Sequence, residues 1–163
     1  MLDYRRGTGR RVWKAVAAVA ALALAQGVCL AQATDNPFQG SWAYKQTCGQ
    51  HHTAEIKLVQ AGTDVTGDWS DGTQASGSDG KLKGSIHDGK LFVRYCGSDE
   101  QAGYAVCPDY EANETDYFVR RGSDLVWYQM TGKKGDNTFR KYVVLHAAVN
   151  GKPVPGDSKC SGS

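Results

Sequence analysis

After residue 33, the chain alternates apolar and polar side chains over short segments and shows almost no helical periodicity. Glycine, aspartate and asparagine interrupt these segments at short intervals, and these residue types favour turns. Alternation with a period of two places the apolar side chains on one face of an extended strand. The pattern therefore predicts an all-β fold whose strands each have one buried face and one face toward water.

We expect about eight strands, most of them joined by short turns. They cover residues 40–47, 54–58, 65–69, 82–86, 90–96, 114–121, 124–131 and 138–149. The Gly-, Ser- and Asp-rich stretch 71–80 is expected to hold only a short or irregular strand, because little in it can pack. Asp88-Gly89 is the strongest hairpin signal, since a two-residue turn requires residues that tolerate a positive φ.

Strands joined by sequential hairpins form an antiparallel meander, and both of its edge strands stay unpaired in an open sheet. Closing the sheet into a barrel pairs these edges, which would otherwise aggregate. We therefore expect an antiparallel up-and-down barrel of about eight strands, wide enough for its own side chains or for one small ligand. A two-sheet β-sandwich is the alternative that the same alternation allows.

Residues 1–33 have the three parts of a secretory signal peptide. A basic segment with five Arg and Lys residues precedes an Ala-, Val- and Leu-rich run over 15–25, and alanines flank Gln32. The run is shorter than the roughly 20 apolar residues that span a bilayer. We expect residues 34–163 to form one secreted or periplasmic domain. The choice between general and twin-arginine export stays open, because Arg10-Arg11 matches the twin-arginine motif only in part.

Four cysteines remain after the predicted cleavage: Cys48, Cys96, Cys107 and Cys160. An even number in a small exported domain predicts two disulfides, for which three pairings are possible. Cys96 and Cys107 bracket one short irregular loop, so we predict a bond between them and a second bond between Cys48 and Cys160. No Cys-x-x-Cys pair is present, and no metal site is expected.

The predicted mature chain is slightly acidic. The leader contains five basic residues and one acidic residue, which leaves 14 Lys and Arg against 16 Asp and Glu, a formal charge of −2. Proteins that bind nucleic acid present a basic surface, so nucleic acid is not an expected partner. We also expect no cofactor, no membrane span after cleavage, and a monomer.

A family resemblance supports the barrel. Gly40-Ser41-Trp42 opens the first predicted strand, and the sequences IKLVQ, VTGDW and GKLKG follow at 56–60, 65–69 and 80–84. Over residues 40–96 this pattern resembles the calycin-like barrels, the superfamily of lipocalins and avidins. In those folds a Gly-x-Trp near the N-terminus seals one end of the barrel, so the resemblance implies this position for Trp42. It names no ligand, because neither an avidin-type biotin site nor a later lipocalin motif accompanies it.

The sequence gives no sign of a catalytic site. It lacks a Gly-x-Ser-x-Gly elbow, and the remaining cysteines are expected to be oxidised. Pairs of acidic residues such as Glu114 and Asp116 are expected to be solvated loop charges, whereas glycosidase chemistry requires a buried carboxyl group. His51 and His52 are expected in an exposed polar turn. We therefore expect a protein that is not an enzyme.

Aromatic residues on the predicted strands are the richer signal. Trp and Tyr combine a flat apolar face with a polar tip, which suits ligand pockets and interfaces. We predict ligand contacts for Trp42, Tyr44, Trp127 and Tyr128, with filling of the barrel as the alternative for Trp42. Trp127 and Tyr128 are adjacent in a strand, so one of them should lie outside. The first hypothesis is an exported binding protein with a small apolar or sugar-like ligand in the barrel mouth.

The alternative hypothesis is a periplasmic or secreted inhibitor of an envelope hydrolase. The loop 97–113 would contact the partner through Tyr104, Tyr110, Asp109 and Glu111. A loop held by a disulfide is preorganised, and preorganisation lowers the entropic cost of binding. Capping of the barrel by the same loop is a third interpretation.

Overall fold

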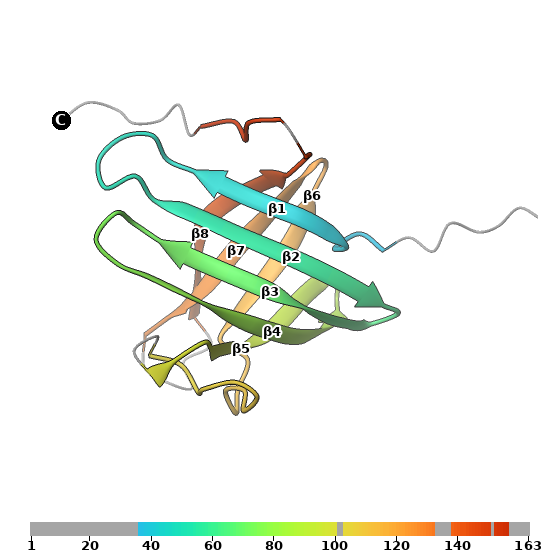
Figure 1. The fold of residues 1–163 in the computed structure, drawn as a ribbon. Helices are drawn as coiled ribbons and strands as arrows, with labels where there is room; N and C mark the ends of the chain where they lie inside the picture. Colours follow the sequence, from blue (N-terminus) through green and yellow to red (C-terminus); the bar gives the residue numbers. More distant parts are fainter. Residues whose placement is uncertain (1–35, 101–102, 133–137, 151, 157–163) are drawn as a thin grey trace, which may run out of the picture. The chain divides into compact units, whose positions relative to one another are not determined.

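The structure is a computed structural model that describes residues 36–100, 103–132, 138–150 and 152–156. Its strands are β1 (Gly40–Lys45), β2 (Thr53–Ala61), β3 (Asp64–Gly72), β4 (Gly77–His87), β5 (Lys90–Gly97), β6 (Asp116–Arg121), β7 (Asp124–Thr131) and β8 (Thr138–Ala147). Each strand pairs antiparallel with the next, and β1 pairs with β8, so the sheet is a closed up-and-down barrel (Figure 1). The predicted barrel is confirmed. Within the described ranges, no helix has the length and hydropathy needed to cross a bilayer.

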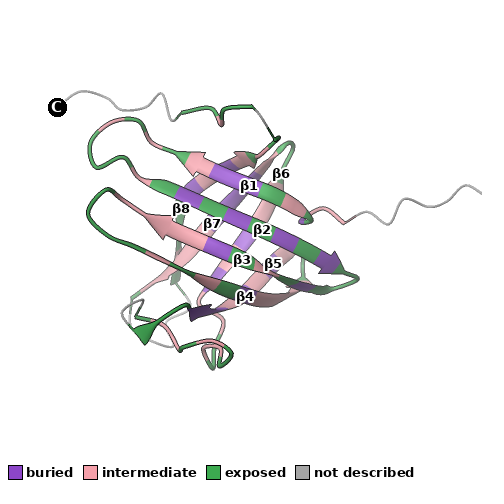
Figure 2. Cartoon of the chain, in the orientation of Figure 1, coloured by how far each residue is buried: buried purple, intermediate pink, exposed green. Residues whose placement is uncertain are grey.

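Alternation of buried and exposed side chains is strictest along β2. Ala54, Ile56, Leu58 and Gln60 point into the barrel, and the residues between them are exposed (Figure 2). The interior-facing side chains of the other strands complete one hydrophobic core. The period-two pattern of the sequence therefore corresponds to the inner and outer faces of the barrel wall.

The prediction for the stretch 71–80 was wrong. β3 extends regularly to Gly72 and β4 begins at Gly77, so that Asp71 lies opposite Ser78 and Gly72 opposite Gly77. Thr73 Oγ1 accepts hydrogen bonds from the N–H groups of Ala75 and Ser76 in the short connection. Backbone hydrogen bonds hold these strand ends, so the scarcity of packable side chains does not prevent the strands from forming.

Glycines allow β3 and β4 to bend as the barrel closes. A Cβ atom on Gly67, Gly80 or Gly84 would lie 2.0 Å from a backbone carbonyl oxygen of the neighbouring strand. No side chain fits in such a space, and glycine within a strand marks a tight bend or a close backbone approach. The Asp88-Gly89 turn has φ angles of 53° and 70°, which confirms the predicted hairpin.

Trp42 closes one end of the barrel, as the resemblance implied. Its side chain is 4% exposed, its indole Nε1 donates a hydrogen bond to the carbonyl oxygen of Phe38 at 3.0 Å, and the Arg120 guanidinium lies 4.3 Å from the ring centre. The buried Gln60 side chain accepts a hydrogen bond from the Phe38 N–H at 3.1 Å. These contacts hold the segment before β1 across what we call the closed end.

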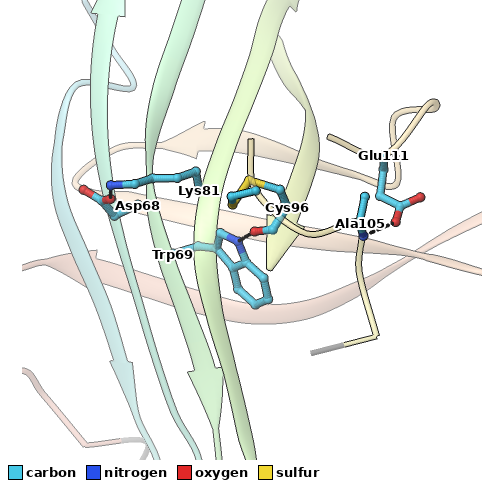
Figure 3. The surroundings of a disulfide bond; sticks show 7 residues. Asp68, Trp69, Lys81, Cys96, Ala105 and Glu111 are labelled. Atoms are coloured by element: carbon cyan, nitrogen blue, oxygen red, sulfur yellow. Dashed lines mark hydrogen bonds and ion pairs between the residues drawn. A yellow bond between two sulfur atoms is a disulfide. The ribbon is translucent and has the colours of Figure 1, made fainter. Parts of the chain in front are cut away.

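A disulfide between Cys96 and Cys107 is confirmed, with the two Cα atoms 5.0 Å apart. It ties the end of β5 to the β5–β6 connection, and the carbonyl oxygen of Cys96 accepts a hydrogen bond from Trp69 Nε1 at 3.2 Å (Figure 3). Cys48 is also disulfide-bonded. Its predicted partner, Cys160, lies outside the described residues.

We predict that Gly84→Ala destabilises the fold by about 3 kcal/mol, at the upper end of the usual cost of overpacking. The new Cβ would lie 2.0 Å from the Phe92 carbonyl oxygen, so β4 and β5 would have to separate. Gly89→Ala is the control, because its Cβ meets open space and only its positive φ is strained, at about 1–2 kcal/mol. Urea unfolding measures both, and equal losses would contradict the prediction.

Candidate functional site

The end of the barrel opposite Trp42, which we call the open end, gathers aromatic, acidic and histidine side chains. It carries the longer connections between strands, which lie toward the left of Figure 1. We call these side chains the mouth cluster. Its members are Tyr44, His52, Trp69, Asp71, Tyr95, Tyr104, Asp116, Trp127 and Tyr142. The cluster draws on six strands and two connections, so the closure of the whole barrel is required to assemble it.

Asp116 is the more deeply buried of the two carboxylates in the mouth cluster. It is 7% exposed, and its Oδ2 accepts hydrogen bonds from Trp127 Nε1 at 2.6 Å and from the Tyr95 hydroxyl at 3.2 Å. Its Oδ1 accepts a hydrogen bond from the Met130 N–H at 3.3 Å. All three donors are neutral groups. The expectation that Asp116 is a solvated loop charge was therefore wrong.

Burial raises the pKa of Asp116 to about 6. The hydrogen bonds from Trp127, Met130 and Tyr95 favour the ionised form and limit the rise, while the nearby charge of Asp71 adds to it. Burial, together with Asp116, also raises the pKa of Tyr95 and Tyr104. Burial and the nearby carboxylates therefore both disfavour further negative charge in the mouth cluster.

A second polar group joins three elements at the rim of the barrel. Asp71 accepts hydrogen bonds from His52 Nε2 at 2.6 Å and from the Tyr142 hydroxyl at 2.8 Å. Because an ionised carboxylate only accepts, His52 Nε2 must carry a proton. The Tyr142 hydroxyl lies 3.0 Å from the same nitrogen. Burial and the hydrogen bond to Asp71 raise the pKa of Tyr142.

A β-bulge in β8 turns Tyr142 inward. Val126 pairs with Val144 and Tyr128 with Lys141, so Trp127 lies opposite two residues of β8 instead of one. Both of these residues, Tyr142 and Val143, can then face the interior. The Tyr142 ring packs edge-on against Trp127 at 5.2 Å between ring centres, and this contact links the Asp71 and Asp116 groups.

The arrangement of His52, Asp71 and Tyr142 differs from a catalytic relay. In a relay, one ring nitrogen takes the proton of the nucleophile while a carboxylate holds the other nitrogen. Here both Asp71 and the Tyr142 hydroxyl contact the same nitrogen, Nε2, and the hydroxyl also donates to Asp71 directly. The geometry fits hydrogen-bonded positioning of the three side chains rather than proton transfer from Tyr142 through His52.

The β5–β6 connection inserts Tyr104 into the open end. β5 pairs with β6 only over Lys90–Val93, and beyond this point Gly97 hydrogen-bonds with the connection instead. Tyr104 fills the gap, with its ring centre 4.9 Å from Trp69 and 5.7 Å from Tyr95. Tyr104 therefore covers part of the mouth cluster.

The structure separates the four residues that were predicted to contact a ligand. Tyr44 and Trp127 both lie in the mouth cluster, whereas Trp42 lies at the closed end. Tyr128 is on the outer face of the barrel, where its ring stacks on Tyr117 at 4.7 Å. The expectation that Trp127 and Tyr128 face opposite sides is confirmed. Only Tyr44 and Trp127 remain together as candidates for one site.

The four residues predicted to contact a protein partner are also dispersed. Tyr104 points into the barrel, while Tyr110 lies on the outside against Lys83, whose Nζ is 4.1 Å from the ring centre. Glu111 accepts a hydrogen bond from the Ala105 N–H at 2.8 Å within the connection (Figure 3). Asp109 is exposed. These four side chains do not present one common contact surface.

Sequence reasoning missed six members of the mouth cluster as site residues: His52, Trp69, Asp71, Tyr95, Asp116 and Tyr142. The expected exposed turn holds for His51, but the His52 side chain is only 15% exposed. Asp116 has the same parity in β6 as the buried Phe118, and this signal could have placed it inside. Among the described residues, no three His, Cys, Asp or Glu side chains are grouped to hold a metal ion.

Two hollows lie on the surface of the barrel near strands β1 to β4. One of about 450 Å³ lies by the outer sides of β1, β2 and β3, and its lining includes Val154 of the segment after β8. The other, of about 230 Å³, lies at the rim of the open end between the ends of β3 and β4. Asp71 and Asp79 both line this rim hollow, which therefore borders the mouth cluster.

Comparisons of the chain with protein-family models, with curated proteins and with solved structures find no match. The class of the protein is therefore defined by its own structure, a closed antiparallel barrel of eight strands. This architecture is compatible with a calycin-like barrel.

Asp116 should make stability depend on pH. Its raised pKa means that the folded chain binds a proton more tightly than the unfolded chain, so the stabilisation is complete below pH 4 and is lost as the pH rises through about 6. The shift corresponds to roughly 3 kcal/mol. Asp116→Asn cannot titrate and isolates this effect. The unfolding free energy of the wild type relative to the variant should fall by most of that amount between pH 4 and 7, and a constant difference would contradict the assignment.

Proposed function

We propose that the protein is an exported, non-enzymatic binding protein that holds a small ligand at the open end of its barrel. The observation that carries this proposal is the mouth cluster, which combines aromatic rings with two carboxylates at one end of a closed barrel. Ligand sites favour the mouths of β-barrels, where apolar walls surround a few convergent polar groups. The closed end differs, because Trp42 and Arg120 pack against each other there.

Export is part of the proposal. It is supported by the signal-like composition of residues 1–33 and by the Cys96–Cys107 disulfide, since such bonds persist mainly in oxidising compartments. We also propose a calycin-like relationship, on the basis of the Gly-x-Trp at residues 40–42 and the up-and-down barrel. Intact mass of the protein from envelope or medium should correspond to a chain that starts at Thr34. A full-length mass, or a lipid on Cys29, would contradict this part.

Three probes of similar size test the binding proposal: 2-phenylethylammonium, 2-phenylethanol and 3-phenylpropanoate. Trp69 and Trp127 lie in the mouth cluster, so their fluorescence should report occupancy. We expect a saturable change with at least one probe at millimolar concentration. Tyr142→Ala should weaken binding about tenfold, the loss expected for about 1.4 kcal/mol of contact.

Tyr128→Ala is the matched control, because it removes the same side chain from the outer face of the barrel. It should leave the affinity within about twofold of the wild type, less than 0.5 kcal/mol. The proposal is wrong if none of the three probes gives a saturable change, or if the two variants weaken binding equally while both remain folded.

A further inference from the structure

We infer that the ligand of the mouth cluster is an organic cation, a protonated amine carried on an aromatic or apolar body. This inference rests on the proposed function and adds the chemical class of the ligand. It is carried by two carboxylates that converge on a set of aromatic rings without a lysine or arginine partner in the described part of the chain.

Most of the described donors to the two carboxylates of the cluster are neutral groups. Asp116 receives hydrogen bonds from an indole, a hydroxyl and a backbone amide, and Asp71 receives them from a hydroxyl and from His52. None of the described ion pairs joins Lys or Arg to either carboxylate. Buried charge is costly unless it is paired, so an incoming cation gains an attraction that no described Lys or Arg supplies.

The closed end provides an internal comparison. There the chain places its own cation, the Arg120 guanidinium, over the face of Trp42. At the open end, the rings of Tyr104, Trp127 and Tyr142 accompany carboxylates instead. Aromatic faces attract cations through the ring quadrupole, and a carboxylate beside the rings adds a charge-assisted hydrogen bond. The closed end therefore has its own cation, whereas no described Lys or Arg pairs with the carboxylates of the open end.

The two carboxylates differ in their exposure to solvent. The side chain of Asp71 is 18% exposed and lines the rim hollow of about 230 Å³ together with Asp79. Tyr142 is 37% exposed, whereas Asp116 is 7% exposed and lies deeper. An ammonium group therefore meets Asp71 and Tyr142 first, and the apolar body of the ligand lies toward Trp127 and Tyr104. An anionic ligand would be repelled by the carboxylates at both levels.

The same three probes test which class of ligand the site prefers, because they share a phenyl body and differ in charge. At pH 7.5, 2-phenylethylammonium should bind at least about tenfold more tightly than 2-phenylethanol or 3-phenylpropanoate, as expected for a charge-assisted hydrogen bond. Asp71→Asn should reduce this preference to within about threefold. Asp68→Asn is the matched control on the outer face of β3, where Asp68 pairs with Lys81 (Figure 3), and it should keep the full preference.

The outcomes distinguish a failure of the cation inference from a failure of the proposed binding function. If 2-phenylethanol or 3-phenylpropanoate binds as tightly as the amine and Tyr142→Ala weakens that binding about tenfold, the cation inference is wrong and the proposed function stands. If no probe binds, both are wrong. If Asp71→Asn and Asp68→Asn reduce the preference equally, the site does not lie at Asp71. Should Asp71→Asn fail to fold, the order of the three probes on the wild-type protein decides the inference.

Discussion

The pairing of β1 with β8 is the constraint on which the rest of the structure depends. The ladder is short: Trp42 pairs with Ala147 and Ala43 with His146, and the Ala148 N–H donates to the Ser41 carbonyl oxygen at 2.8 Å. These contacts convert an open meander into a barrel without free edges. Toward the open end, Lys45 of β1 is bridged instead by Gly156 of the segment after β8, and Tyr142 of β8 hydrogen-bonds to His52 and Asp71. The polar groups of the mouth cluster therefore help to hold the barrel closed as well as forming a candidate site.

This double role gives the cluster its particular chemistry. The hydrogen bonds that link strands at the open end use carboxylates as acceptors and neutral groups as most of the donors, so the links leave negative charge among aromatic rings. Asp116 shows the consequence most clearly, because burial raises its pKa to about 6 although three donors stabilise its ionised form. This buried charge, with no Lys or Arg partner among the described residues, is the physical basis of our inference that the ligand is a cation.

The sequence predicted the parts of the fold that depend on local pattern. Alternation predicted the strands of the barrel, and the short loop between Cys96 and Cys107 predicted the disulfide. The resemblance at Gly40-Ser41-Trp42 implied the position of Trp42 at the closed end. The sequence did not predict the inward position of Tyr142. A one-residue bulge reverses the alternation in β8, and no residue type in the strand indicates this bulge. The sequence also could not bring Asp71 and His52 together, since their contact depends on long-range strand closure.

The most direct test of the central claim follows the indole N–H signals of the mature protein by ¹⁵N NMR during titration with 2-phenylethylammonium. Trp69 and Trp127 lie in the mouth cluster, and Trp42 lies at the closed end, so the indoles report on opposite ends of one barrel. The account predicts saturable shifts for Trp127 and Trp69 with Trp42 unchanged. Shifts confined to Trp42, or no saturable shift of any indole, would contradict it.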